Sequence, residues 1–271
     1  MPTPNTHVLV WRTTPANAYQ YDTFHVPVSH TCGLIRTSAS TSRELKNGGS
    51  LTWRSSNNSV ARRIILNASA RQHRRQEPST GNDLLRQRII EPLGLARDMF
   101  IGLPDAEHSR VATIYEPRAD GAQQPLTDEN TAPYRRAGIP SSGGFATARG
   151  MAALYQMMLQ GGSLNGTRLF SRRLIEFVTR NHTGDMVDGG MGMPMHRGLG
   201  VHVRGTTETI RGLGTLASPR TFGHGGVGSS YCWGDPDSGV SFAYLTNSRI
   251  PDPWHSDRLD RVANLVHSAI D

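Results

Sequence analysis

Hydrophobic residues recur at helical spacing in the part of the chain that follows residue 80. In residues 82–95 they repeat with a period of about 3.6 residues, and Pro92 and Gly94 end the pattern. The clearest helix is predicted for residues 148–162, with Thr147 as its N-terminal cap. Its apolar stripe consists of Met151, Leu154, Tyr155, Met158 and Leu159. We therefore predict a buried helix here, whose methionines fill the core rather than bind a cofactor.

Polar residues between the apolar segments predict turns and further helix starts. Asn165-Gly166 predicts a tight turn, and Ser171 is placed to cap the short helix that follows it. Ser256 is predicted to cap the last helix, in which five apolar positions share one face. Those positions are Leu259, Val262, Ala263, Val266 and Ile270. Residues 102–144 show no clear period and are predicted to form a long irregular connection.

Three apolar segments near the end of the chain predict adjacent strands. They are residues 198–205, 229–235 and 239–247. The last of these is almost continuously apolar, as expected for a central strand. Asp235 to Gly239 has the composition of a hairpin turn. Helices followed by antiparallel strands and a terminal helix predict an α+β fold, with an antiparallel sheet flanked by helices.

The composition limits the classes of protein to consider. A chain of 271 residues can form one large domain or two small ones. No apolar run approaches the roughly 18 residues of a membrane span, so we expect a soluble protein, with the cytoplasm as the favoured compartment. Cys32 and Cys232 fit neither a disulfide framework nor a metal site and are interpreted as unrelated thiols. The sequence predicts no metal and no cofactor, and it indicates no oligomeric state.

The positive charge is concentrated in the first quarter of the chain. Residues 1–75 hold nine arginines, one lysine and two acidic residues, a net charge of +8, whereas the remainder has a net charge of −1. Three interpretations stay open: an arm for nucleic acid or an anionic surface, a transit-like leader, or degraded or wrongly translated sequence before an ordinary domain. The basic residues are scattered, which argues against nucleic acid. We divide the chain into a basic, atypical segment, 1–78, and a domain, 79–271.

A glycine cluster around His224 is the strongest chemical signal. Gly223, Gly225 and Gly228 match the spacing G-x-G-x-x-G. A dinucleotide site would need a helix after this cluster, but a strand and a hairpin are predicted there. Glycines at a strand entry also allow a ligand to approach closely. The other interpretation that stays open is a flexible strand entry with a solvated histidine.

Residues 222–247, FGHGGVGSSYCWGDPDSGVSFAYLTN, resemble the third-motif hairpin of the β-lactamase-related serine hydrolases. This family includes class C β-lactamases, penicillin-binding proteins and esterases. Its esterase-like branch often has His-x-Gly in place of Lys-Thr-Gly, which corresponds here to His224-Gly225-Gly226. Four further segments are similar in the same order, RQRIIEPLGL, GLPDAEHSRVA, the run from PSSGG to LNGTRLFS, and, more faintly, VSHTCGL. The resemblance covers residues 83–250 and implies a β-lactamase/transpeptidase-like fold, incomplete at its N-terminus.

The resemblance also implies a mechanism. In this family the serine of Ser-x-x-Lys attacks a carbonyl and forms an acyl-enzyme, and the tyrosine of Tyr-x-Asn assists proton transfer. The backbone N–H of Val227 would correspond to one oxyanion-hole donor. This sequence contains neither motif: its one lysine, Lys46, has Arg43 three residues before it and Ser42 four before. Ser55 stands where the family has the tyrosine. We interpret the chain as a truncated or mistranslated member.

Several other residues have side chains that could take part in chemistry. Asp185 and Asp188 lack a third ligand at metal spacing, which favours a solvated loop. His196 and His202 flank a predicted strand and are expected to pack rather than to bind a ligand. Ser142 lacks the Gly-x-Ser-x-Gly elbow and is only an outside candidate for a nucleophile.

Two hypotheses from different classes follow. The first is a serine hydrolase for a small ester or amide, with esters favoured by His-Gly-Gly and with little or no activity expected from this chain. The second is a catalytically dead binding or scaffold protein that keeps the cleft wall. A nucleic-acid binder that depends on residues 1–75 is a third and weaker hypothesis.

Overall fold

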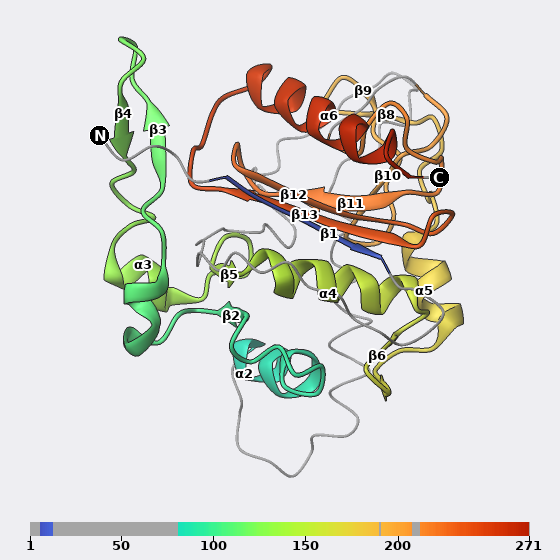
Figure 1. Cartoon of the computed structure of the whole chain (residues 1–271), viewed down its shortest axis with the longest axis horizontal. Helices are drawn as coiled ribbons and strands as arrows, with labels where there is room; N and C mark the ends of the chain where they lie inside the picture. Colours follow the sequence, from blue (N-terminus) through green and yellow to red (C-terminus); the bar gives the residue numbers. More distant parts are fainter. Residues whose placement is uncertain (1–5, 13–80, 190, 208–211, 271) are drawn as a thin grey trace, which may run out of the picture.

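The computed structural model describes residues 6–12, 81–189, 191–207 and 212–270 of the chain (Figure 1). For residues 6–12 only the backbone is described. The predictions that concern Cys32, Lys46 and Ser55, together with their neighbours in the first quarter, lie outside these residues.

A five-stranded antiparallel sheet forms the centre of the molecule. Its order is β1-β13-β12-β11-β10. The strands are β1 (Thr6–Arg12), β13 (Val240–Thr246), β12 (Ser230–Asp235), β11 (Phe222–Gly225) and β10 (His202–Val203). β1 comes from the basic first segment and pairs with β13 along its full length, from Thr6 opposite Thr246 to Arg12 opposite Val240. The predicted antiparallel sheet is therefore confirmed, and one of its strands comes from far away in the sequence.

The two C-terminal strands form as the hydrophobic pattern predicted. Every residue of β12 and β13 is buried. The turn between them is closed by the carboxylate of Asp235, which accepts hydrogen bonds from the backbone N–H of Asp237 (3.1 Å) and the hydroxyl of Ser238 (2.8 Å). Continuous burial requires a cover on both faces, and α4 (Ala148–Leu159) and α6 (Trp254–His267) provide it from opposite sides (Figure 1).

The third predicted strand, residues 198–205, is much shorter than expected. Only His202 and Val203 pair with β11. The backbone N–H groups of Gly198 and Leu199 donate instead to the carbonyls of Val201 and Val178, at 2.9 and 2.7 Å. Because these donors are already used within the loop and at the end of α5 (Arg172–Thr179), the ladder cannot extend in this direction.

α4 packs its predicted stripe against one face of the sheet. The hydroxyl of Thr147 accepts the N–H of Gly150 at 3.0 Å, which confirms the predicted N-terminal cap. Buried residues of α4 and the sheet form one cluster, with Met151, Ala152, Tyr155, Phe222, Cys232 and Leu245 among them. The methionines of the helix are core residues, as predicted.

α6 covers the other face, and its start differs from the prediction. The helix begins at Trp254, so Ser256 lies inside it and is not the cap. The carboxylate of Asp252 accepts both the N–H of Ser256 (3.2 Å) and its hydroxyl (2.6 Å). The predicted apolar face is confirmed, since Leu259, Val262, Val266 and Ile270 pack with the aromatic residues of β12 and β13.

The region predicted as irregular, residues 102–144, and its two flanks contain several short elements. These are β2 (Met99–Ile101), a 3₁₀ helix (Asp105–Arg110), β3 (Tyr115–Pro117), β4 (Gln123–Pro125), α3 (Ala132–Ala137) and β5 (Gly144–Ala146). They are three to six residues long, which is too short to produce a readable hydrophobic period. The prediction of an irregular connection was therefore wrong in detail.

The remaining elements surround this frame. They are α2 (Gly81–Leu85) and the π-helical turn Arg86–Ile90, β6 (Ser163–Leu164), β7 (Thr167–Arg168), β8 (Val187–Asp188) and β9 (Met193–Pro194). The turn at Asn165-Gly166 is present, with φ of 49° and 81°. Ser171 caps α5 by accepting the N–H of Leu174 at 3.2 Å, as predicted. Among the described helices, none combines the length and hydrophobicity needed to cross a bilayer.

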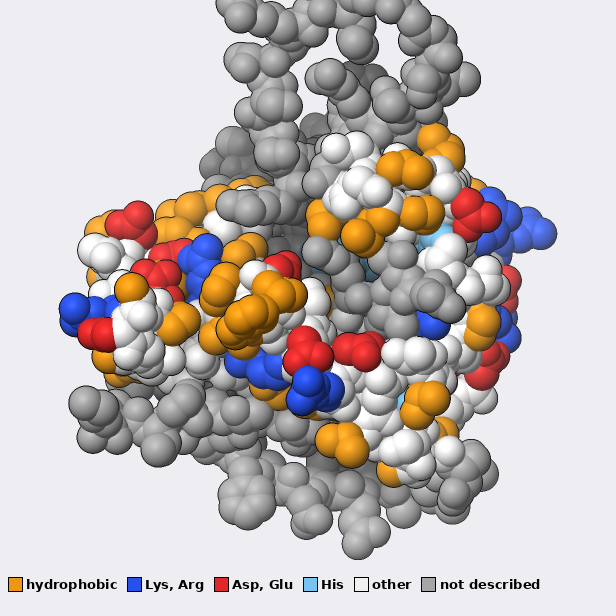
Figure 2. All heavy atoms as spheres, turned by 90° about the horizontal axis from the view of Figure 1, so that it is seen from above, with side chains coloured by type: hydrophobic (Ala, Val, Ile, Leu, Met, Phe, Trp, Pro, Cys, Tyr) orange, Lys and Arg blue, Asp and Glu red, His pale blue; other side chains and the backbone are white. Residues whose placement is uncertain are grey.

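One face of the molecule, seen in Figure 2, carries hydrophobic side chains in separate groups with charged side chains between them. Within α6, Trp254 and Leu265 are the large hydrophobic residues with high exposure, at 65% and 72%. Some apolar residues of α6 are therefore exposed and do not pack in the core.

Candidate active site

The glycines of β11 allow the aromatic residues of β12 to pack against its backbone. Gly223 lies opposite Trp233, and Gly225 lies opposite Tyr231. A Cβ atom at Gly225 would lie 2.6 Å from Cδ2 of Tyr231, and one at Gly223 would lie 2.4 Å from the carbonyl oxygen of Cys232. These distances leave no room for a side chain. Two of the three glycines of the G-x-G-x-x-G spacing thus have a packing role that is unrelated to a phosphate group.

The loop after β11 is held at both ends by backbone hydrogen bonds. The N–H of Gly226 donates to the carbonyl of Ser230 at 3.0 Å, and the carbonyl of Gly228 accepts the N–H of Ile250 at 2.9 Å. Arg258 of α6 donates to the same Gly228 carbonyl at 3.0 Å. Burial lowers the pKa of this guanidinium, but arginine still remains protonated at neutral pH. The loop is therefore fixed before any ligand arrives.

Val227 lies between these two anchors. Its side chain is 47% exposed. Within the described part of the chain, its backbone N–H makes no hydrogen bond. An unused N–H in a fixed and exposed loop is the kind of donor that can bind a carbonyl oxygen or an oxyanion.

His224 precedes this loop as the third residue of β11. Its Nδ1 lies 2.8 Å from the carbonyl oxygen of Gly225. Because a carbonyl only accepts hydrogen bonds, Nδ1 carries the proton. Burial lowers the pKa of the imidazole from its ordinary value of 6.5, the hydrogen bond to Gly225 opposes this shift, and the charge of Arg197 adds to it. His224 is therefore neutral at pH 7.

A second histidine, His202 of β10, lies against His224. The two ring centroids are 4.7 Å apart, with an interplanar angle of 34°. Arg197 Nη1 lies 2.9 Å from His202 Nε2, and Tyr231 Oη lies 3.2 Å from His202 Nδ1. Arg197 also donates from Nε and Nη2 to Asp188 Oδ2, at 3.0 and 2.8 Å. The four residues Asp188, Arg197, His202 and Tyr231 form a polar chain that ends beside His224.

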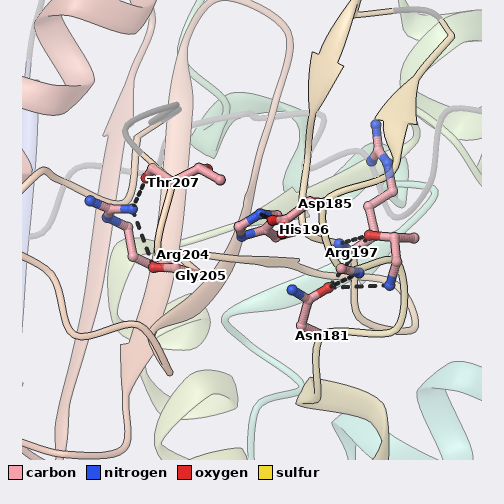
Figure 3. A network of polar contacts seen from close by, with 9 residues as sticks. Asn181, Asp185, His196, Arg197, Arg204, Gly205 and Thr207 are labelled. Carbon is pink, nitrogen blue, oxygen red and sulfur yellow. Dashed lines mark hydrogen bonds and ion pairs between the residues drawn. The ribbon is translucent and has the colours of Figure 1, made fainter.

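The structure changes the interpretation of the two aspartates. Asp185 lies in a solvated loop, as predicted, with its side chain 82% exposed and 3.2 Å from Nε2 of His196 (Figure 3). The prediction is wrong for Asp188, whose side chain is only 17% exposed because it pairs with Arg197. No group of three His, Cys, Asp or Glu side chains among the described residues is arranged to hold a metal ion.

The two histidines that flank the predicted strand differ in role. His196 is buried, with 2% exposure, and packs against Gly205, as expected for a core residue. His202 contacts His224, which sequence reasoning missed. The spacing of 22 residues between the two histidines carries no local signal, since their proximity depends on the register that places His202 opposite Gly223.

Ser142 does not have the surroundings of an activated nucleophile. Its N–H donates to Ile139 at 3.0 Å, and its carbonyl accepts the Tyr134 hydroxyl at 3.5 Å. No basic side chain of the described regions forms a hydrogen bond with its hydroxyl. Among the described residues, Ser142 therefore has no base that could activate its hydroxyl as a nucleophile.

The antiparallel sheet between helices places this protein in the α+β class. Its candidate site is a glycine-bordered histidine near the end of β11, followed by the amide of Val227, which makes no hydrogen bond to any described residue. The Beta-lactamase family model matches residues 74–267, and the chain belongs to this family of β-lactamase-related serine hydrolases. The suspected resemblance is therefore confirmed.

Individual relatives agree with this membership. The chain is 31% identical over 203 residues to the "Esterase/beta-lactamase LipL" of Mycobacterium tuberculosis, an alignment that covers 64% of this chain and 45% of that protein. Among solved structures, it is similar to a penicillin-binding protein homologue from Caulobacter crescentus, with a TM-score of 0.59 and 30% identity over 71% of this chain and 53% of the other.

A family VIII carboxylesterase has a TM-score of 0.56 and 28% identity to this chain, over 76% of this chain and 54% of the carboxylesterase. The chain thus spans about half the length of these relatives.

Proposed function

We propose that His224, Gly225, Gly226 and Val227 form one wall of an acyl-transfer cleft that binds a small ester or amide. The N–H of Val227, which makes no hydrogen bond to any described residue, carries this proposal. A donor at this position can stabilise the negative charge that develops on a carbonyl oxygen during acyl transfer. The name of the family VIII carboxylesterase and the His-Gly-Gly sequence favour esters over β-lactams.

The proposed activity of this chain is limited by its sequence. Ser-x-x-Lys and Tyr-x-Asn are absent from all 271 residues. Without a lysine or another base, a serine hydroxyl is a poor nucleophile at neutral pH. We therefore propose that the cleft-bearing domain consists of residues 79–271 together with β1 from the basic segment 1–78, and that the chain binds acyl ligands without turning them over.

Turnover is tested with a chromogenic ester and a chromogenic cephalosporin, each with and without a serine-reactive phosphonate. We expect rates equal to the buffer background for both substrates. A rate that the phosphonate abolishes would contradict the proposed inactivity and would show that a nucleophile is present.

Binding is tested at Val227 itself. Val227→Pro removes the N–H, whereas Val227→Ala keeps the N–H and removes most of the side chain. With N-phenylacetylglycinamide as ligand, followed by NMR titration, we expect Val227→Pro to weaken binding by about two- to tenfold, the worth of one hydrogen bond. Val227→Ala should bind within about twofold of the original protein. Equal affinities for the two variants would show that the Val227 N–H does not bind the ligand.

The alternative is a binding or scaffold protein that retains the fold without any acyl-transfer role. The absence of an identifiable base favours it. Ligand binding that does not depend on the Val227 N–H, together with background turnover, would support this alternative.

A further inference from the structure

The protonation state of the His224 wall can be worked out from hydrogen-bond donors and acceptors alone. Nδ1 of His224 carries a proton, because its partner is the Gly225 carbonyl. The other ring nitrogen, Nε2, makes no hydrogen bond to any described residue. In the neutral ring, Nε2 is therefore a free acceptor.

His202 is held in a defined state by the same reasoning. A guanidinium can only donate, so the 2.9 Å contact from Arg197 Nη1 requires an unprotonated Nε2 on His202. The proton is then on Nδ1, which donates to the Tyr231 hydroxyl at 3.2 Å. If Nε2 of His202 were protonated, its N–H would face an N–H of Arg197, and the charged imidazolium would lie against the charged guanidinium. The polar chain thus keeps His202 neutral.

The charge next to His224 is also balanced. Arg197 is paired with Asp188, whose side chain is mostly buried. Among the described residues, the titratable and charged groups placed around His224 are His202 on β10, Tyr231 and Cys232 on β12, and the Arg197–Asp188 pair. None of them presents an uncompensated anion that would favour a protonated His224.

We propose that this wall accepts a hydrogen bond at His224 Nε2 from a neutral substrate, and that Arg197 and His202 are positioning residues that maintain this acceptor. The substrate class is an uncharged ester or amide with an N–H or O–H donor near the scissile carbonyl, and carboxylate-bearing substrates are disfavoured. The inference rests on the proposed function, because it assigns a substrate class to the same wall. The lowered pKa of His224 agrees with it.

The state of the ring is tested first, by long-range ¹H–¹⁵N NMR of the histidines in the full chain at pH 7.5. We expect His224 to show the Nδ1–H tautomer with an unprotonated Nε2, and His224→Gln assigns its signals. Arg197→Gln should raise the pH at which His224 titrates, because the arginine charge lowers its pKa. Arg220→Gln is the matched control, since Arg220 forms an exposed pair with Asp237 away from this chain of contacts. A protonated His224 at pH 7.5 would overturn the inference.

Specificity is tested with a matched pair of ligands, N-phenylacetylglycinamide and N-phenylacetylglycine, at pH 7.5. We expect the neutral amide to bind at least about fivefold more tightly, and His224→Lys to reverse this order, because a cation favours the carboxylate. Circular dichroism and thermal melting verify that the variant is folded. A carboxylate preference in the original protein, with clear binding, would overturn this inference alone. Binding of neither ligand would overturn the proposed function and this inference with it.

Discussion

At the residue scale, both the backbone angle and the contacts of Gly228 require a residue without a side chain. It has φ of 71°, and a Cβ atom there would lie 2.6 Å from the carbonyl oxygen of Ile250. Gly239 has nearly the same φ, 72°, but a Cβ atom there would meet nothing within 4 Å. The sequence shows a glycine at both positions and does not reveal this difference, because Ile250, which a side chain at position 228 would meet, lies 22 residues further along the chain.

These two glycines provide a matched pair of substitutions. Both Gly228→Ala and Gly239→Ala introduce a side chain at positive φ, which costs about 1 kcal/mol or more in each. Only Gly228→Ala also forces Ile250 away, so we expect it to lose about 1–3 kcal/mol more of the free energy of unfolding. Urea denaturation of the two variants measures this difference. Equal losses would show that the loop after β11 is not held against Ile250.

At the scale of elements, the helices were predicted well and the short strands poorly. α4 and α6 each contain more than two turns of a repeating apolar face, so their packing side could be read from the pattern. The strand that contains β10 was predicted, but not its length, because that depends on hydrogen bonds that the preceding loop makes within itself and with α5. The predicted start of α6 was wrong because the side chain that accepts a backbone N–H there belongs to Asp252 and not to Ser256.

The packing of α6 on the sheet leads to a second prediction. Leu259 is 4% exposed and lies in the cluster with Trp233 and Phe242, whereas Leu265 is 72% exposed. We expect Leu259→Ala to lower the free energy of unfolding by about 2–5 kcal/mol and Leu265→Ala to change it by less than about 0.5 kcal/mol. Chemical denaturation measures both. A large loss for Leu265→Ala would contradict the placement of this side chain on the surface of α6.

At the scale of the whole molecule, two histidines, the buried His267 and the partly buried His224, link stability to pH. His267 of α6 stacks on Trp233, with ring centroids 4.4 Å apart, and donates to the Leu213 carbonyl at 2.9 Å. Burial lowers its pKa, as it does for His224, while the hydrogen bond to Leu213 and the charge of Asp235 oppose the shift at His267. In the unfolded chain both rings bind protons near the ordinary value of 6.5, and in the folded protein they do so only at lower pH.

The sign of the pH dependence follows from this difference. Between the folded and unfolded pKa values the unfolded state binds more protons, so the free energy of unfolding falls as the pH is lowered below about 6.5. The loss ends once the pH is below the folded pKa. His267→Gln should reduce the slope of stability against pH in this window, whatever its effect at pH 8. Urea titrations between pH 5 and 8 measure the slope. An unchanged slope would show that His267 does not contribute to the loss of stability at low pH.

The sequence by itself determined the family, the antiparallel hairpin, the apolar faces of α4 and α6 and the position of the third motif, because each of these depends on short-range patterns or on contiguous residues. Tertiary structure decided how the site is built. His202, Arg197 and Asp188 reach His224 only through the register of β10 and β11 and the fold of the loop before them. Contacts between residues so far apart depend on the packing of the sheet, and a local pattern cannot encode them.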